Sequence, residues 1–136
     1  MKAQRRRRPS TLKPAIIIAL ALSVSTAALA ASSRDHMAAI FKGCKIWDQG
    51  EVTDGQVACL RSAAGKAERD MNTAYRGRIQ ITDESARARL ESVQRLWEQS
   101  TRANCEYFGG NPGSAAGYIC LIDAMIQRKQ TLGALD

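Results

Sequence analysis

The sequence is poor in the residues that carry most enzyme chemistry. It has a single histidine, His36, only three prolines, and aromatic residues make up 5% of the chain. Hydrolytic and group-transfer reactions need a nucleophile and a base that share a proton near neutral pH, and His36 lies in a polar N-terminal stretch. Phosphate-binding glycine motifs and the ligand spacing of a zinc site are also missing. The sequence therefore predicts a protein that is not an enzyme and uses no metal or cofactor.

Long hydrophobic runs are equally scarce, and the one that exists lies near the N-terminus. A basic stretch from Lys2 to Lys13 precedes an apolar run from Ala15 to Leu29, and Ala28 and Ala30 occupy the −3 and −1 positions of a cleavage site. This pattern is typical of a secretory signal peptide, and the run is shorter than the roughly 20 residues of a membrane-spanning helix. We expect a signal peptide at 1–30, a single domain at 31–136, and a periplasmic or secreted product. Paired arginines leave twin-arginine export as the alternative route.

Net charge nearly disappears once the leader is removed. Six of the 20 basic residues lie in the leader, which leaves 14 Lys and Arg against 13 Asp and Glu and a net charge near +1 rather than +7. Nucleic-acid binding loses its main support, because the remaining arginines alternate with acids on what reads as a solvated helix face. We therefore expect no nucleic-acid partner and no stable membrane span after cleavage.

Cysteine is sparse, but its number and spacing are informative. The four cysteines all follow the leader and form two equally spaced pairs, Cys44 with Cys59 and Cys105 with Cys120. An even number in an exported chain favours disulfides over metal binding or catalysis. Three connectivities are open, and we favour the two local bridges, since each would tie a loop to the end of a helix. Each bridge would then stabilise the fold by about 3 kcal/mol in the chain-entropy model.

Strand-like alternation is absent, whereas helical periodicity recurs along the whole mature chain. The patterns predict a short helix up to about Trp47, a long helix from a Thr53–Gln56 capping box to about Gln80, another from Asp83 to Phe108, and a last helix capped by Ser114. The predicted fold class is all-α: a small disulfide-stapled bundle with two long antiparallel helices plus shorter N- and C-terminal helices.

The third of these helices is the expected centre of the bundle. Leu90, Val93 and Trp97 form an apolar stripe on one of its faces, and Gly109-Gly110 ends it. We expect Trp97, and Tyr75 of the preceding helix, to lie in the core. Asn72 and Gln94 adjoin these positions and are expected to form hydrogen bonds between helices.

An ordered set of residues runs through the predicted helices. It comprises Cys59-Leu60, Met71-Asn72-x-x-Tyr75, Gln94-Arg95-x-Trp97, Cys105, Cys120-Leu121, Arg128 and Leu132. With both cysteine spacings, this set resembles the LprI-like lysozyme inhibitor family over about Cys44 to Leu135. The resemblance implies an all-helical, disulfide-stapled envelope protein and, for at least one branch of the family, inhibition of host lysozyme.

Two positions depart from the family pattern. Met71 stands where the family has leucine, which is a volume-conserving change. Thr101 stands where the family tends to have arginine, and Arg102 follows it. One helical position is a rotation of about 100°, so we do not expect Arg102 to replace that arginine on the same face.

Partner binding is expected in the two loops that the disulfides would hold in place, because a loop ordered before binding loses less entropy on association. The candidates are Asp48, Glu51 and Asp54 in the first loop, which would face a cationic lysozyme, and Asn111 and Ser114 in the second. The leading hypothesis is an exported binding protein that inhibits lysozyme by occluding its cleft. The alternative is a structural or stress-related envelope protein that binds another periplasmic protein or a wall component. A small-ligand carrier with a groove between helices ranks last, and the sequence does not predict the oligomeric state.

Overall fold

The computed structural model describes residues 33–47, 51–111 and 113–134. Within these ranges the chain contains helices and no strand. The helices are an N-terminal segment at 33–43, α2 at Asp54–Ile81, α3 at Glu84–Gly109 and α4 at Ala115–Gly133. The all-α prediction is confirmed, with two long helices between two shorter ones. The proposed signal peptide lies outside the described residues, and so does Asp48.

Side-chain caps set where each labelled helix begins. The Thr53 hydroxyl accepts a hydrogen bond from the Gln56 backbone N–H, and the Gln56 side chain accepts one from the Thr53 backbone N–H. Asp83 accepts from the Ala86 backbone N–H ahead of α3, and Ser114 accepts from the Gly117 N–H ahead of α4. These contacts satisfy backbone donors that a helix start leaves open.

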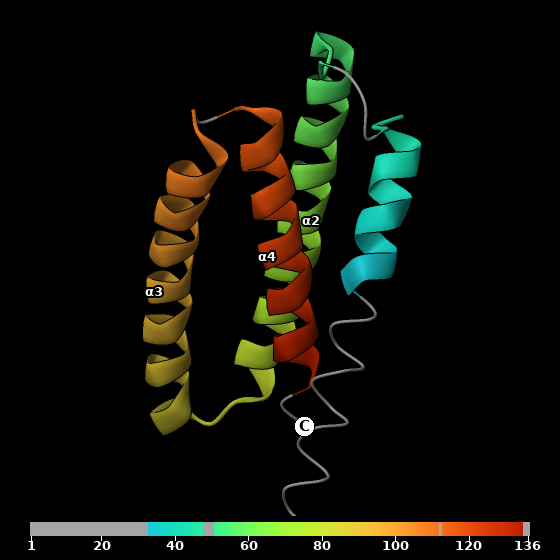
Figure 1. The fold of residues 1–136 in the computed structure, drawn as a ribbon. Helices are drawn as coiled ribbons and strands as arrows, with labels where there is room; N and C mark the ends of the chain where they lie inside the picture. The colour runs from blue at the N-terminus through green and yellow to red at the C-terminus, as the bar shows by residue number, and fades with distance from the viewer. Residues whose placement is uncertain (1–32, 48–50, 112, 135–136) are drawn as a thin grey trace, which may run out of the picture.

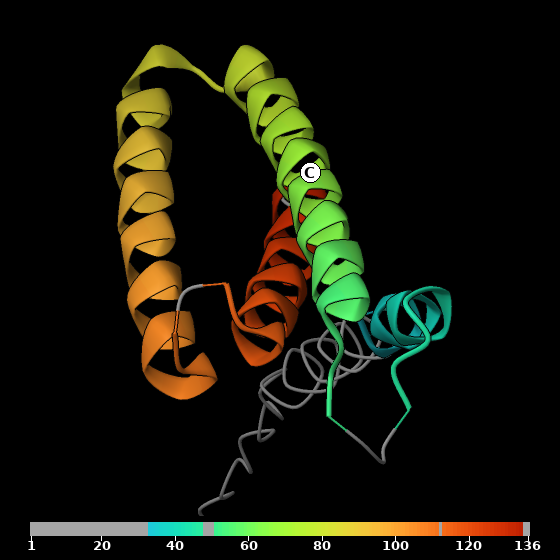
Figure 2. The same cartoon turned by 90° about the horizontal axis from the view of Figure 1, so that it is seen from above.

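The helix α4 is the central element of the bundle. The long helices α2 and α3 run antiparallel, and α4 packs against both of them, most extensively against α2 (Figures 1 and 2). The N-terminal segment lies on the far side of α2 and α4 from α3. The expectation that α3 is the centre is therefore wrong, since α3 is an outer helix.

The apolar core lies between the N-terminal segment, α2 and α4. Its fully buried members are Leu60 of α2 and Ile122 of α4, joined by Cys44 and Ala64. Partly buried residues packed around them include Met37, Ile40, Ile46, Ala67, Tyr118, Ile119 and Ile126.

The helix α3 adds little to this core. Its only buried residues are Gln94 and Cys105. Val93 of the predicted stripe is 51% exposed, and Leu96 beside it is also exposed. The outward position of α3 explains the difference, because a helix that packs on one neighbour buries only a narrow face.

Both disulfides join the local pairs. Cys44 is bonded to Cys59 and Cys105 to Cys120, each across 15 sequence positions. The first links the end of the N-terminal segment to α2, and the second links α3 to α4. The favoured connectivity is confirmed, and the bridges fit a protein that matures in an oxidising compartment. In the part of the chain that the structure describes, no helix has the length and apolarity needed to cross a bilayer.

Candidate functional site

A cleft separates α2 from α3 and has α4 as its floor. Its volume is about 590 Å³, within the range of ligand-binding pockets. We call it the α2–α3 cleft. Apolar side chains of α4 and α2, including Leu121, Met125 and Met71, line its base, and polar side chains of both long helices line its walls. The further wall residues include Arg61, Glu68, Asn72, Glu98, Thr101, Arg102 and Glu106.

A polar cluster joins the three helices beside the cleft. The side-chain oxygen of Gln94, which is 3% exposed, accepts a hydrogen bond from Nε of Arg128 at 2.9 Å. The Gln94 amide nitrogen donates to Glu98 at 3.0 Å and contacts the sulfur of Met71 at 3.3 Å. The Arg128 guanidinium lies 5.5 Å from the centre of the Trp97 ring, which is a cation–π distance.

Burial and charge change the acid–base behaviour of this cluster. Burial, followed by the nearby carboxylates of Glu91 and Glu98, raises the pKa of Tyr75 above its ordinary value. Burial lowers the pKa of Arg128, but a guanidinium remains protonated throughout the physiological range. Both groups therefore keep their protons near neutral pH.

The turn between α3 and α4 is closely packed. A Cβ atom added to Gly109 would lie only 2.7 Å from backbone atoms of Gly117, so the two helices cross at this pair of glycines. The Ser114 hydroxyl also donates to the Gly109 carbonyl at 2.7 Å. With the Cys105–Cys120 bridge, these contacts fix the end of α3 against the start of α4.

An aromatic pair lies at this fixed end of α3. Tyr107 and Phe108 are 81% and 79% exposed, and their rings meet edge to face with centroids 4.9 Å apart. We call these two residues the aromatic knob. Large aromatic side chains dominate the energetics of protein interfaces, and this pair lies next to a disulfide and a tight turn. The pair is therefore a candidate surface for protein contact.

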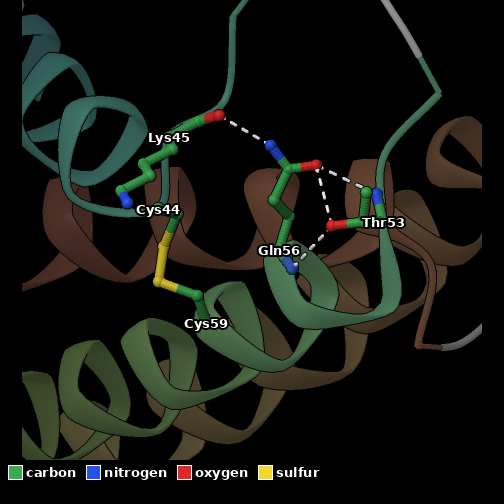
Figure 3. The surroundings of a disulfide bond; sticks show 5 residues. All are labelled: Cys44, Lys45, Thr53, Gln56 and Cys59. Atoms are coloured by element: carbon green, nitrogen blue, oxygen red, sulfur yellow. Dashed lines mark hydrogen bonds between the residues drawn. A yellow bond between two sulfur atoms is a disulfide. The ribbon is translucent and has the colours of Figure 1, made fainter.

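The other disulfide lies close to the start of α2 (Figure 3). Next to Cys44, Lys45 has a φ of 55°, and its carbonyl accepts a 2.6 Å hydrogen bond from the Gln56 side chain. Gln56 thus connects the residue after Cys44 to the capping box of α2. The carboxylates of Glu51, ahead of α2, and of Asp54, the first residue of α2, are exposed beside these contacts.

The structure separates the predicted site residues into different regions. Asn111 lies on the rim of the α2–α3 cleft, whereas the Ser114 hydroxyl is engaged as the cap of α4. Glu51 and Asp54 lie at the start of α2. The family-motif residues Asn72, Tyr75, Gln94, Trp97 and Arg128 lie along the cleft and the polar cluster.

Two of these motif residues differ from expectation. Trp97 and Tyr75 are half-buried and are not part of the apolar core, and Trp97 lines the cleft instead. Thr101 and Arg102, two successive positions of α3, both line the cleft.

Sequence reasoning missed the aromatic knob. The adjacent pair Tyr107-Phe108 directly precedes the glycines that end α3, and that position was a usable signal, because the last residues of an outer helix have few neighbours. Among the described residues, no group of His, Cys, Asp and Glu side chains could hold a metal ion.

Comparison with known families gives one match. A family model described as "Lysozyme inhibitor LprI" matches residues 46–132, which is more than half of the chain. The matched range contains α2, α3, all but the last residue of α4, and three of the four cysteines. No curated protein and no solved structure matches the chain.

Proposed function

Because the chain belongs to the LprI lysozyme inhibitor family, we propose that it is an exported, non-enzymatic protein that inhibits a lysozyme by occluding its cleft. The single domain at 31–136 acts after a signal peptide at 1–30 is removed, in the periplasm or outside the cell. The family match carries this proposal. The two disulfides support the export step, since such bridges persist in oxidising compartments.

The aromatic knob is the proposed contact with the enzyme. Glycoside hydrolases of this kind cleave in a groove that holds two carboxyl groups and a sugar chain. Tyr107 and Phe108 project two exposed rings from a short, disulfide-tied end of the molecule. Rings held in place before contact lose little side-chain entropy when a partner covers them. Asn111, exposed in the turn three residues after Phe108, is the proposed polar contact beside the knob.

The acidic loop has a secondary role in this proposal. Glu51 and Asp54 are exposed near the start of α2, and a lysozyme is strongly cationic. Complementary charges of this kind mainly accelerate encounter rather than deepen affinity. We therefore expect changes at Glu51 and Asp54 to alter the association rate and its salt dependence.

The direct test is a titration of the exported protein against lysozymes of different classes on cell-wall substrate. Wild-type protein should inhibit at least one class, and the double variant Tyr107→Ala/Phe108→Ala should inhibit at least tenfold more weakly, since two interface aromatics contribute about 1.4 kcal/mol or more. Ile81→Ala is the matched control, because it removes an exposed apolar side chain at the C-terminal end of α2, away from the aromatic knob.

Each result decides a separate point. A folded wild-type protein that inhibits no lysozyme class would refute the function. Full inhibition by the double variant would refute the knob as the contact while leaving the function intact. Capture of one stoichiometric envelope partner, without lysozyme inhibition, would favour the alternative structural or stress-related role.

A further inference from the structure

The arrangement of α2, α4 and α3 leaves one position of a four-helix bundle open. The helix α4 packs against both long helices, which lie closest together at the turn that joins them and diverge away from it (Figure 2). The residues that line the α2–α3 cleft run from Arg61 to Asn72 on α2 and from Trp97 to Glu106 on α3. At 1.5 Å per residue these stripes are about 16 Å and 14 Å long. The cleft is thus as long as two to three turns of an added helix.

The base of the cleft suits an apolar helix face. Leu121 and Met125 of α4 and Met71 of α2 line it, together with the ring of Trp97. Methionine side chains are flexible and polarisable, and they are common on surfaces that accept different apolar partners. A helix that entered the cleft would place residues at i, i+3 or i+4, and i+7 against this base.

The walls of the cleft favour a cationic partner. Glu68 on α2 and Glu98 and Glu106 on α3 place carboxylates on both walls, and all three residues are exposed. Two arginines also line the cleft. Arg61 donates from its Nε to the neutral phenol oxygen of Tyr118 at 3.1 Å, and its guanidinium, 6.0 Å from the ring centre, keeps its positive charge. The described lining therefore carries three carboxylates against the two guanidiniums of Arg61 and Arg102, a small excess of negative charge.

From this combination we propose that the α2–α3 cleft binds a cationic amphipathic α-helix. The apolar face of that helix packs on Leu121, Met125 and Trp97, and its lysines or arginines meet the wall carboxylates. Membrane-active antimicrobial peptides have this chemistry, so the protein would sequester such peptides in addition to inhibiting lysozyme. The inference does not depend on the aromatic knob, which lies outside the set of lining residues.

The cleft can be blocked by substituting a glycine in its wall. Gly65 lies within α2 and lines the cleft, and a Cβ added there would meet only the end of the Arg69 side chain, at 3.4 Å. Replacing a glycine in a helix interior generally stabilises the helix, by up to about 1 kcal/mol for alanine. Gly65→Leu should therefore fill the cleft without unfolding the protein. Gly77→Leu is the matched control, since Gly77 lies on the same helix, outside the cleft, with nothing within 4 Å of an added Cβ.

The experiment uses Trp97 as the reporter. The exported protein carrying Trp47→Phe, with its disulfides formed, is titrated with a synthetic amphipathic Leu/Lys peptide, a Leu/Glu peptide of the same pattern, and a scrambled Leu/Lys peptide. We expect saturable one-to-one binding of the Leu/Lys peptide alone. Gly65→Leu should raise the Kd at least tenfold, Glu68→Lys should raise it severalfold, and Gly77→Leu should leave it unchanged. Circular dichroism verifies that each variant is folded.

Three results would overturn the inference: no saturable change in Trp97 emission, equal binding of the Leu/Glu peptide, or an unchanged Kd in folded Gly65→Leu. Lysozyme inhibition is measured on the same variants and should survive Gly65→Leu. A loss of peptide binding without a loss of inhibition therefore separates the cleft from the proposed function.

Discussion

Gln94 is the residue on which contacts from three helices converge. Its amide joins Arg128 of α4, Glu98 of its own helix and the sulfur of Met71 on α2. A buried amide with both ends engaged holds its neighbours in one geometry, whereas a missing partner leaves a charged donor without its acceptor. The contacts of Gln94 are important for holding α3 against the other helices, because α3 buries only one other residue.

We predict that Gln94→Ala lowers the free energy of unfolding by about 2–3 kcal/mol, since it removes the acceptor of the half-buried Arg128 guanidinium. Urea denaturation followed by circular dichroism measures the change. Gln99→Ala, on the exposed side of the same helix, should change stability by less than about 0.5 kcal/mol. Equal effects of the two substitutions would contradict the role assigned to Gln94.

The sequence predicted that Gln94 forms a hydrogen bond between helices, but it did not identify Arg128 as the partner. A polar residue next to the Trp97 stripe suggested hydrogen bonding between helices. Arg128 is 34 positions away along the chain, and which helix faces which residue depends on how the bundle assembles. Exposure is equally non-local: the place of Tyr107-Phe108 directly before the glycines was a signal in the sequence, but the exposure of the two rings followed only once α3 was known to be an outer helix.

At the scale of elements, helix boundaries were predictable because they depend on neighbouring residues. Thr53, Asp83 and Ser114 each cap a helix at or within a residue of the expected start. The order of packing was predicted wrongly, since α4 and not α3 lies at the centre. The signal lay in α4, where Tyr118, Ile119, Leu121, Ile122, Met125 and Ile126 cover one continuous arc of about 160° at 100° per residue. An apolar face that broad can pack on two neighbouring helices, which is the position of α4.

For α2, we predict that Gln56→Ala destabilises the protein by about 1–2 kcal/mol. The substitution removes the acceptor for the Thr53 N–H and the donor to the Lys45 carbonyl, so both the capping box and the disulfide loop lose a contact. Thermal unfolding provides the measurement. Gln80→Ala near the exposed end of the same helix serves as the control, and a comparable loss there would show that the capping contacts contribute nothing.

At the scale of the whole molecule, stability is unevenly distributed. The core ties the N-terminal segment, α2 and α4 together, whereas α3 is attached through Gln94, Cys105 and the crossing of Gly109 with Gly117. A helix with so few buried side chains is expected to open locally before the rest of the fold.

We predict that Cys105→Ala/Cys120→Ala lowers the free energy of unfolding by about 3 kcal/mol, given the length of the ring that the bridge closes. Amide hydrogen exchange in α3 should accelerate more than exchange in α2. In Cys44→Ala/Cys59→Ala, by contrast, α3 should keep its protection while the chain before α2 loses order. Uniform acceleration across all helices in the first variant would argue against a separately anchored α3.

The pairing of neighbouring cysteines also determines how the chain comes apart. Each bridge closes its own ring, and no covalent cross-link spans the region between Cys59 and Cys105. A single proteolytic nick at the turn around Thr82 and Asp83 would therefore divide the protein into two pieces held only by non-covalent packing. The same topology would let two molecules exchange halves across that turn, with every sulfur bond intact.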